Sequence, residues 1–350
     1  MPIAINGSGT LTGLSVGGLE NGIITPAELS TGAPSWDAQY NLTNVASINS
    51  GPLAGFRNAI INGNFDIWQR GTSQTAAGYG SADRWAMQRT GSTCTMSRQV
   101  FALGQTDVPG EPTYFCRMVV TSVAGASNRV LLGQNIEGVR AFAGQQITVS
   151  FWAKADATKN IAINHYQTFG TGGSPSAAVS QIGVNKTSLT TSWQRITHTF
   201  AVPSISGKSL GSGNNDSFGF EIYLDAGSTF NASTDTLGQQ SGTFDIAQVQ
   251  VEAGPVATAF ERRPIGTELA LCQRYYETGS LSFCWNAGSP TDIKVTRAFI
   301  VTKRATPTVS GTGTLGTLTG ATGTVDRIQA NFTATLNGNV SAAFTASAEL

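Results

Sequence analysis

The sequence predicts a mainly β protein: an antiparallel β-sandwich (jelly roll) with an extended N-terminal arm and a small C-terminal β domain preceded by a short helix. Several segments alternate apolar and polar residues with a period of two, which is typical of strands with one buried face. Stretches rich in glycine, which supplies 41 of the 350 residues, separate them. One short segment alone has the spacing of an amphipathic helix.

Residues 1–55 consist of short apolar steps separated by Gly, Pro, Ser and Asn. Such a segment cannot bury a core by itself. We expect an extended arm that becomes ordered by pairing with copies of itself or with a larger assembly. A plain flexible tail is the alternative.

Residues 56–262 carry the strongest strand patterns and are long enough for one sandwich domain. The expected strands lie at 147–155, 160–166, 193–202, 218–224 and 244–252. Their alternation places one set of side chains toward the core. This set comprises Ile147, Val149, Phe151, Ala153, Ile161, Ile163, Ile196, Phe200, Val202, Phe218, Phe220, Ile222 and Leu224.

Residues 263–350 form the C-terminal β domain, and its entry segment is the expected helix. Thr267 is a candidate N-cap, Leu269, Cys272 and Tyr276 share one stripe, and Gly279 is placed to end the helix. Strand-like runs follow at 293–303 and 325–336. Between them, the Gly/Thr stretch 311–324 is either a mobile loop or an extended turn-and-strand region.

Composition excludes several classes of function. The net charge is zero and no basic run occurs, which argues against a nucleic-acid partner. Charged residues make up 12% of the chain, against roughly 25% in typical soluble domains. No stretch approaches the roughly 20 apolar residues of a transmembrane helix, and the N-terminus does not resemble a secretory signal. We therefore expect no membrane insertion and no export signal, although the uncharged polar surface is typical of extracellular β proteins.

The four cysteines, Cys94, Cys116, Cys272 and Cys284, do not form a disulfide scaffold or a zinc motif. We expect them to be neutral thiols. A Cys94–Cys116 or a Cys272–Cys284 bridge is the alternative.

The same alternation that predicts the core also predicts an outward-facing set of aromatic and polar residues. If their strands share a sheet, these side chains line one concave surface. Flat apolar rings flanked by hydrogen-bonding groups suit a sugar, which has apolar C–H faces and a polar edge. Burial under loops or against another subunit is the alternative, since aromatics are also enriched at interfaces. The candidate glycan contacts are Trp152, Asn164, Tyr166, Arg195, Glu221 and Tyr223.

Several segments resemble known families. AIINGNFDIWQRGT (59–72), SADRWAM (81–87) and EAGPVATAFERRPIGTELALCQRYYE (252–277) resemble jelly-roll domains of bacteriophage tail-fibre and tail-spike-like proteins, as GTLTGLSVGGLENG (9–22) resembles their N-terminal regions. SFWAKA, WQRITHTFAV and FDIAQVQVEAG are similar to strands of jelly-roll carbohydrate-binding modules. Together these segments are distributed over most of the chain.

This resemblance implies a virion protein that assembles in the host cytoplasm without a signal peptide. It implies a homotrimer that binds other virion proteins through residues 1–55 and a host-surface glycan or protein elsewhere. Because the distal part of such fibres often contacts the receptor, Trp285 is a candidate tip residue. Jelly-roll glycan modules often hold a structural calcium ion, for which Asn64, Asp66 and Asp245 are candidate ligands.

The sequence contains no recognisable catalytic motif. His198 has the parity of core residues, so we expect a buried histidine rather than a general base. We therefore expect no catalytic residues and no cofactor, and a non-enzymatic phage tail fibre or related appendage. A tail-spike-type glycan depolymerase, and a head fibre or decoration protein with no receptor role, are the alternatives.

Overall fold

The computed structural model describes residues 55–285, 293–314, 316–334 and 338–350, and four two-residue strands before them. The chain divides into two units, Met1–Ala54 and Gly55–Leu350. In the first unit β1 (Ala4–Ile5) pairs with β2 (Leu11–Thr12), and β3 (Ser35–Trp36) pairs with β4 (Leu42–Thr43). The rest of the expected arm, 1–55, lies outside the described residues, apart from Gly55.

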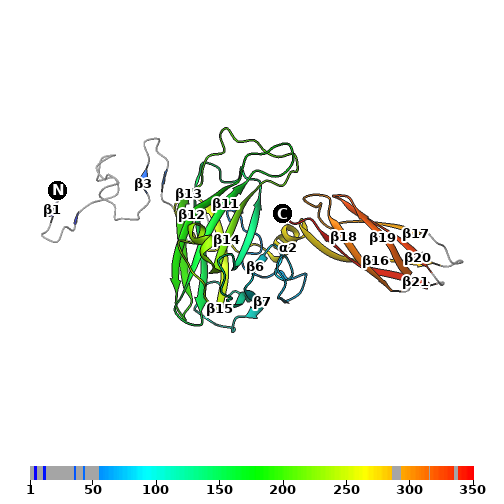
Figure 1. Ribbon diagram of the computed structural model, residues 1–350, viewed down its shortest axis with the longest axis horizontal. Helices are drawn as coiled ribbons and strands as arrows, with labels where there is room; N and C mark the ends of the chain where they lie inside the picture. The colour runs from blue at the N-terminus through cyan, green and yellow to red at the C-terminus, as the bar shows by residue number, and fades with distance from the viewer. Residues whose placement is uncertain are drawn as a thin grey trace. The chain divides into compact units, whose positions relative to one another are not determined.

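Two antiparallel sheets form a sandwich, which confirms the expected fold class (Figure 1). The six-stranded sheet has the order β13 (Gln194–Ala201), β10 (Gln146–Ala155), β15 (Gly242–Ala253), β8 (Tyr114–Thr121), β7 (Thr93–Val100) and β5 (Ser73–Gln74). The five-stranded sheet has the order β12 (Val179–Leu189), β11 (Lys159–Thr168), β14 (Ser217–Ala226), β9 (Arg129–Glu137) and β6 (Ala86–Thr90).

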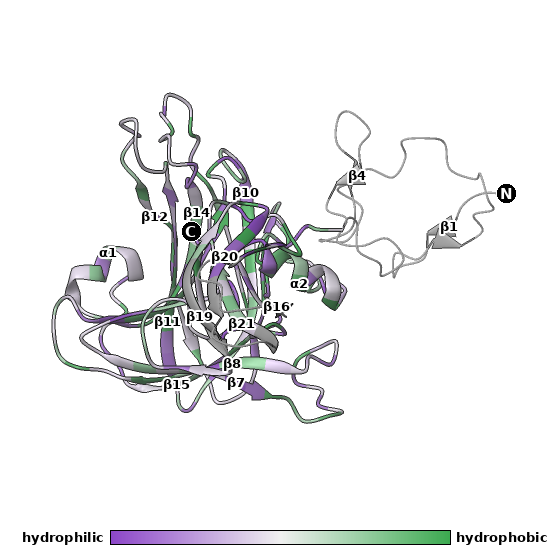
Figure 2. Cartoon of the chain, turned by 90° about the vertical axis from the view of Figure 1, so that its right-hand side faces the viewer, coloured by the Kyte–Doolittle hydropathy of each residue, from purple (hydrophilic) through white to green (hydrophobic). Residues whose placement is uncertain are grey.

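The main core lies between these sheets and contains the side chains that the alternation predicts. All thirteen belong to it or, for Phe200, pack against it while partly buried. Figure 2 shows hydrophilic and hydrophobic residues alternating along sandwich strands such as β10. Burial of these apolar side chains is the dominant stabilising contribution to a domain of this kind.

The segment before β6 closes one end of the sandwich through a buried asparagine. Asn62 Nδ2 donates to the backbone oxygens of Ile67 and Asp83, and its own backbone oxygen accepts from Trp85 Nε1 at 2.9 Å. Trp85 is fully buried in the core and Trp68 packs against the core while partly exposed. Trp68 and Trp85 are therefore structural anchors of this segment.

A short helical segment covers part of the outer face of the five-stranded sheet. It comprises η2 (Ser228–Phe230) and α1 (Asn231–Thr234). A small apolar cluster lies beneath it, formed by Leu131, Ala162, Tyr223, Ala226 and Leu237, with Phe230 packed against them.

The expected helix forms as α2 (Ile265–Gln273), but it is shorter than the pattern predicts. Pro264 rather than Thr267 is the N-cap residue, and Tyr276 and Gly279 belong to a strand. Tertiary contacts explain the early end: the guanidinium of Arg70 lies 3.6 Å from the centroid of the Tyr276 ring. The neighbouring Tyr275 ring is similarly buried beneath Arg84, at 3.5 Å.

Two three-stranded antiparallel sheets follow α2. One has the order β16 (Tyr276–Trp285), β21 (Gly338–Ser347) and β18 (Thr308–Thr314). The other has the order β17 (Ile293–Ala298), β20 (Arg327–Ala334) and β19 (Gly316–Gly323). The Gly/Thr stretch therefore supplies strands, apart from Leu315, which is not described. The buried residues of this second core are Leu281, Phe299, Ile328, Ala330, Ala342, Phe344 and Ala346.

Buried ion pairs hold the C-terminal part together and link it to the sandwich. Lys303 Nζ lies 2.6 Å from Glu277 Oε2, and both side chains are fully buried. Arg84 pairs with Glu349, which also accepts from Arg70 at 2.8 Å. No helix among the described residues is long and apolar enough to span a membrane.

Candidate functional site

The structure divides the six candidate glycan contacts between two sheets. The condition that their strands share a sheet is not met, because β10 pairs with β13 and β15 whereas β11 pairs with β12 and β14. The outer faces of the two sheets point away from each other. Trp152 and Arg195 lie on the six-stranded sheet, and Asn164, Tyr166, Glu221 and Tyr223 lie on the five-stranded sheet.

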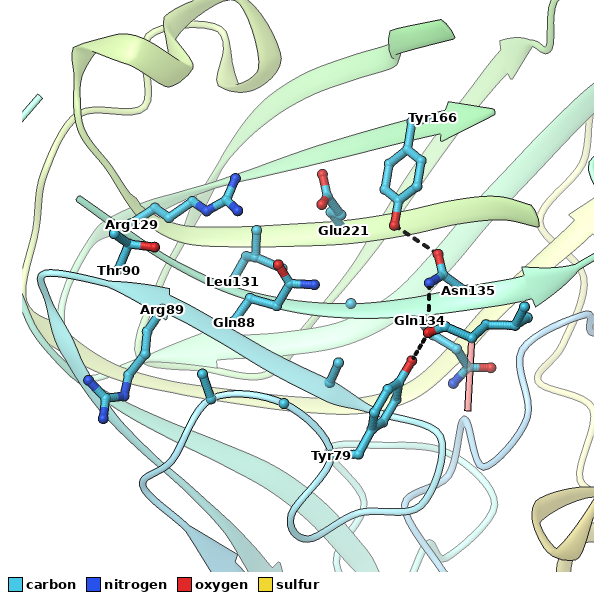
Figure 3. Close-up of a pocket in the computed structure, with 15 residues that line it drawn as sticks. Tyr79, Gln88, Arg89, Thr90, Arg129, Leu131, Gln134, Asn135, Tyr166 and Glu221 are labelled. Atoms are coloured by element: carbon cyan, nitrogen blue, oxygen red, sulfur yellow. Dashed lines mark hydrogen bonds between the residues drawn. The ribbon is translucent and has the colours of Figure 1, made fainter. Parts of the chain in front are cut away.

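A cavity of about 390 Å³ lies on the outer face of the five-stranded sheet (Figure 3). Strands β6, β9, β11 and β14 supply its floor and walls, and the loop 77–79 borders one side. We call it the β9 cavity. Its lining residues include Tyr79, Gln88, Arg129, Asn135, Tyr166 and Glu221.

The ring of Tyr166 lies against the backbone of Gly219 on the neighbouring strand. A Cβ atom at Gly219 would lie 2.1 Å from Tyr166 Cζ, so only glycine leaves room for the ring in this position. The Tyr166 hydroxyl donates to Asn135 Oδ1 at 2.8 Å, as the dashed line in Figure 3 shows. Burial raises the pKa of Tyr166, so the hydroxyl is neutral at physiological pH. An aromatic ring is thereby fixed in the wall of the cavity.

Glu221 supplies the carboxylate of the β9 cavity. Its Oε2 accepts from Nδ2 of the buried Asn164 at 2.8 Å. Burial raises the pKa of Glu221, opposed by hydrogen bonds from Asn164 and Tyr223 and by the charge of Arg129. Asn164 Oδ1 is buried and has no hydrogen-bond partner among the described residues. Asn164 thus positions Glu221 from the neighbouring strand β11 and does not itself line the cavity.

Tyr223 is covered and does not line the β9 cavity. Its side chain is 3% exposed, and its ring lies 6.2 Å from that of Phe230 in the helical segment. Tyr223 is therefore buried beneath a connecting segment, which was the alternative to a glycan contact for the outward-facing aromatic residues.

Among the lining residues that the sequence analysis did not identify are Tyr79, Arg129 and Asn135, whose segments lack strict alternation. Arg129 lies with its guanidinium 4.7 Å from the Phe230 ring centroid, and its buried Nε has no hydrogen-bond partner among the described residues. Tyr79 donates to the backbone oxygen of Leu350 at 3.0 Å, and Asn135 Nδ2 approaches the same oxygen at 3.4 Å. Asn135 could have been identified only from the register of β9 with β14, which pairs it with Gly219 beside the Tyr166 ring.

Trp152 and Arg195 line a second cavity, of about 350 Å³, on the outer face of the six-stranded sheet. Arg195 donates to the backbone oxygen of Thr258 and approaches Ser150 Oγ at 3.4 Å. The two residues are therefore brought together, but away from the β9 cavity.

The histidines occupy structural positions. His198 is partly buried with Nε2 3.0 Å from the Gly183 oxygen, and burial lowers its pKa. His165 is fully buried among aromatic rings, and burial lowers its pKa to about 3. Both imidazoles are thus neutral near pH 7.

The calcium candidates are engaged by different hydrogen-bond partners. Asn64 Nδ2 donates to Asp66 Oδ2 at 2.9 Å, whereas both oxygens of Asp245 accept from Arg117, at 2.7 and 2.8 Å. In the described part of the chain, no group of three or more His, Cys, Asp or Glu side chains is arranged to hold a metal ion.

Three of the cysteines are buried free thiols: Cys94, Cys116 and Cys272. Burial raises the pKa of Cys94 to about 12, so no reactive thiolate is expected there. The side chains of Cys284 and of the candidate tip residue Trp285 lie outside the described residues, although both residues pair with β21 through the backbone.

Comparison with known proteins gives similarity only at the level of solved structures. No protein-family model and no curated protein matches the chain. The enzymatically active domain of tailspike protein 4 of bacteriophage CBA120 is 12% identical, with a TM-score of 0.35 over 60% of this chain; the chain spans 24% of that one. A family 11 carbohydrate-binding module from Clostridium thermocellum, in complex with a β-1,3-1,4-mixed-linked tetrasaccharide, is 11% identical, with a TM-score of 0.31. That match covers 54% of this chain and 98% of the module.

A family 61 module in complex with β-1,4-galactotriose is also 11% identical, with a TM-score of 0.29; the match covers 57% of this chain and 99% of the module. At these identities the likeness concerns the fold, and it assigns no ligand to this chain.

Proposed function

We propose that this protein is a non-enzymatic virion protein, a phage tail fibre or related appendage, that attaches the particle to a host-surface glycan through the β9 cavity. The observation that carries the glycan part is the Tyr166 ring fixed against Gly219, with Asn135 and Glu221 beside it. The virion part rests on the phage-like sequence segments.

The β9 cavity has the chemistry that a sugar requires. Its volume of about 390 Å³ falls in the range of roughly 300–1,000 Å³ usual for small-ligand sites. The Tyr166 ring offers an apolar face to sugar C–H groups. The Asn135 amide and the Glu221 carboxylate offer a donor and acceptors to hydroxyls. These groups are held before binding by the Tyr166–Asn135 and Asn164–Glu221 hydrogen bonds, which lowers the ordering cost of association.

The same cavity supports binding rather than cleavage. Glycosidases generally use two carboxyl groups roughly 5–9.5 Å apart. Glu221 is the only Asp or Glu side chain among the lining residues of the β9 cavity. The lining therefore offers no second acidic side chain for the acid and nucleophile or base pair of that reaction.

We further propose how the chain is assembled into the virion. Residues 1–55 anchor the chain to other virion proteins, and three copies form a homotrimer after folding in the host cytoplasm. Several weak sites on one particle raise avidity by roughly 10²–10⁴-fold. Modest affinity at each β9 cavity is therefore sufficient for attachment. Light scattering on the full chain tests the trimer, and the mass of a single chain would contradict it.

The glycan part is tested by binding of the full chain to purified capsular polysaccharide and lipopolysaccharide preparations and to an oligosaccharide array. We expect saturable binding that Tyr166→Ala weakens about tenfold or more, while Tyr114→Ala, in the same sandwich but outside the cavity, leaves it unchanged. Melting curves of both variants show that they remain folded. Binding that is equal in wild type and Tyr166→Ala, or no binding at all, would refute the role of the cavity. Release of new reducing ends from a polysaccharide would instead establish the depolymerase alternative.

A further inference from the structure

The cavity on the outer face of the six-stranded sheet, here called the β15 cavity, is separate from the β9 cavity because it lies on the opposite side of the sandwich. Its volume is about 350 Å³. Its lining includes Asn64, Trp152, Arg195, Gln248, Phe260 and Arg262.

A β-bulge in β15 shapes its floor. The pairing of β10 with β15 shifts between Ser150 and Trp152, so that one extra residue occurs in β15. The core residues Ile246 and Val249 are three positions apart instead of two, which places Gln248 on the outer side. Gln248 adopts a φ of 49°, a left-handed conformation that is costly for a residue with a side chain. Bulges of this kind re-aim side chains and are over-represented beside functional sites.

Two polar groups in the β15 cavity are fixed before any ligand arrives. Gln248 Nε2 donates to the Pro109 oxygen at 2.7 Å, which holds the loop over one side. Asn64 is 7% exposed, and its Nδ2 is used by Asp66. Its buried Oδ1 has no hydrogen-bond partner among the described residues. A buried acceptor without a partner is costly, and a ligand hydroxyl would satisfy it.

The remaining lining combines aromatic surface with positive charge. Trp152 and Phe260 are half-buried and offer apolar faces. Arg195 and Arg262 are exposed, and backbone oxygens of Thr258 and Gly110 orient them. The lining contains no Asp or Glu side chain. Among the described residues neither guanidinium lies within 4.0 Å of a carboxylate, and the one acid that interacts electrostatically with Arg262 is Asp66, the hydrogen-bond partner of Asn64. The cavity therefore favours an anionic ligand.

We propose that the β15 cavity is a second saccharide subsite, specific for an acidic sugar residue. The sugar ring packs on Trp152 and Phe260, a ring hydroxyl donates to Asn64 Oδ1, and the carboxylate pairs with Arg195 and Arg262. The inference rests on the proposed glycan-binding function for its ligand class, but on none of the residues of the β9 cavity. With a subsite on each face, one sandwich can engage two strands of a surface polysaccharide.

The test is calorimetric titration of the full chain with a panel of acidic oligosaccharides containing galacturonate, glucuronate or sialic acid, each compared with its methyl ester. The ester keeps the ring and hydroxyls but removes the charge. We expect at least one acidic oligosaccharide to bind about tenfold or more tightly than its ester, because hydrogen bonds to charged groups are stronger than neutral ones. Raising the salt concentration should weaken this binding, since the charges are partly exposed.

Substitutions in the β15 cavity test whether the acidic oligosaccharide binds there. Trp152→Ala and the double variant Arg195→Gln/Arg262→Gln should each reduce affinity for the acidic oligosaccharide about tenfold. The matched controls, which should not reduce it, are Trp193→Ala, a half-exposed tryptophan just before β13 and outside the lining, and Arg140→Gln, an exposed arginine outside the lining. Gln248→Gly keeps the left-handed backbone but releases the Pro109 loop, so it should weaken binding without loss of fold.

The outcomes separate this inference from the proposed function. No preference for any acid over its ester, or acid binding that survives Trp152→Ala and the double arginine variant, would refute the second subsite. If Tyr166→Ala weakens glycan binding while acid preference is absent, the proposed function stands and this inference fails. Acid binding that is lost in Trp152→Ala but retained in Tyr166→Ala supports the second subsite whatever happens at the β9 cavity.

Discussion

Replacing Gly219 with alanine should displace the Tyr166 ring and thereby disable the β9 cavity. The added Cβ would lie 2.1 Å from Tyr166 Cζ, whereas non-bonded carbon atoms are optimally about 3.5–4.0 Å apart. The ring must therefore move by more than about 1 Å. Such a movement breaks the 2.8 Å hydrogen bond from the Tyr166 hydroxyl to Asn135.

The expected loss of stability is modest. Overpacking costs about 1–3 kcal/mol, and the lost hydrogen bond about 0.5–1.5 kcal/mol. Reduced freedom of the unfolded chain offsets about 0.4–1 kcal/mol. The net change in unfolding free energy is a decrease of about 0.5–4 kcal/mol, and we expect the sandwich to remain folded. Glycan affinity should fall about tenfold or more, equivalent to about 1.4 kcal/mol.

Urea unfolding and glycan titration on the same preparations measure both effects. Gly266→Ala is the control, because this α2 glycine does not line the cavity and a Cβ added there would have no atom within 4 Å. It should change stability and affinity little. If Gly219→Ala binds glycan as tightly as wild type with unchanged stability, the fixed Tyr166 ring is not what the cavity uses for binding.

Three further predictions concern buried titratable groups. Because the pKa of His165 is lowered from 6.5 to about 3, its contribution to stability is complete above pH 6.5 and is lost as the pH falls toward 3. Wild type should therefore lose about 3 kcal/mol more between pH 7 and 4 than His165→Phe, and equal pH slopes in urea unfolding would contradict this. Glu277→Gln should lower the unfolding free energy by about 3–5 kcal/mol, because it leaves the Lys303 ammonium buried without its partner. Adding Lys303→Met should recover part of this loss in chemical denaturation. An unchanged unfolding free energy in Glu277→Gln would refute the pairing. Glu349→Gln should destabilise the protein similarly through the buried Arg84, and a wild-type melting temperature for this variant would count against that link.

The core was predictable because period-two alternation depends only on local backbone geometry. The segments around Phe151 and Phe220 show it clearly, and both side chains are buried in the sandwich. The extra residue in β15 has no comparable signal. It appears only as a three-residue spacing from Ile246 to Val249, and it needs the partner strand β10 to define the bulge.

The candidate site was only partly predictable, because alternation shows that a side chain faces outward but not from which sheet. Tyr166 and Trp152 have the same outward pattern, yet long-range pairing places them on opposite faces. Tyr223 faces outward as expected, but a segment later in the chain, around Phe230, covers it. Similarly, the helical pattern extends to Tyr276, but Tyr276 lies in β16, where its ring contacts the distant Arg70.

The most direct test of the central claim is an experimental structure of the protein bound to an oligosaccharide that it recognises. The account predicts a sugar ring in the β9 cavity, packed on Tyr166 and hydrogen-bonded to Asn135 and Glu221. A neutral oligosaccharide bound elsewhere on the molecule, with the β9 cavity empty, would contradict it.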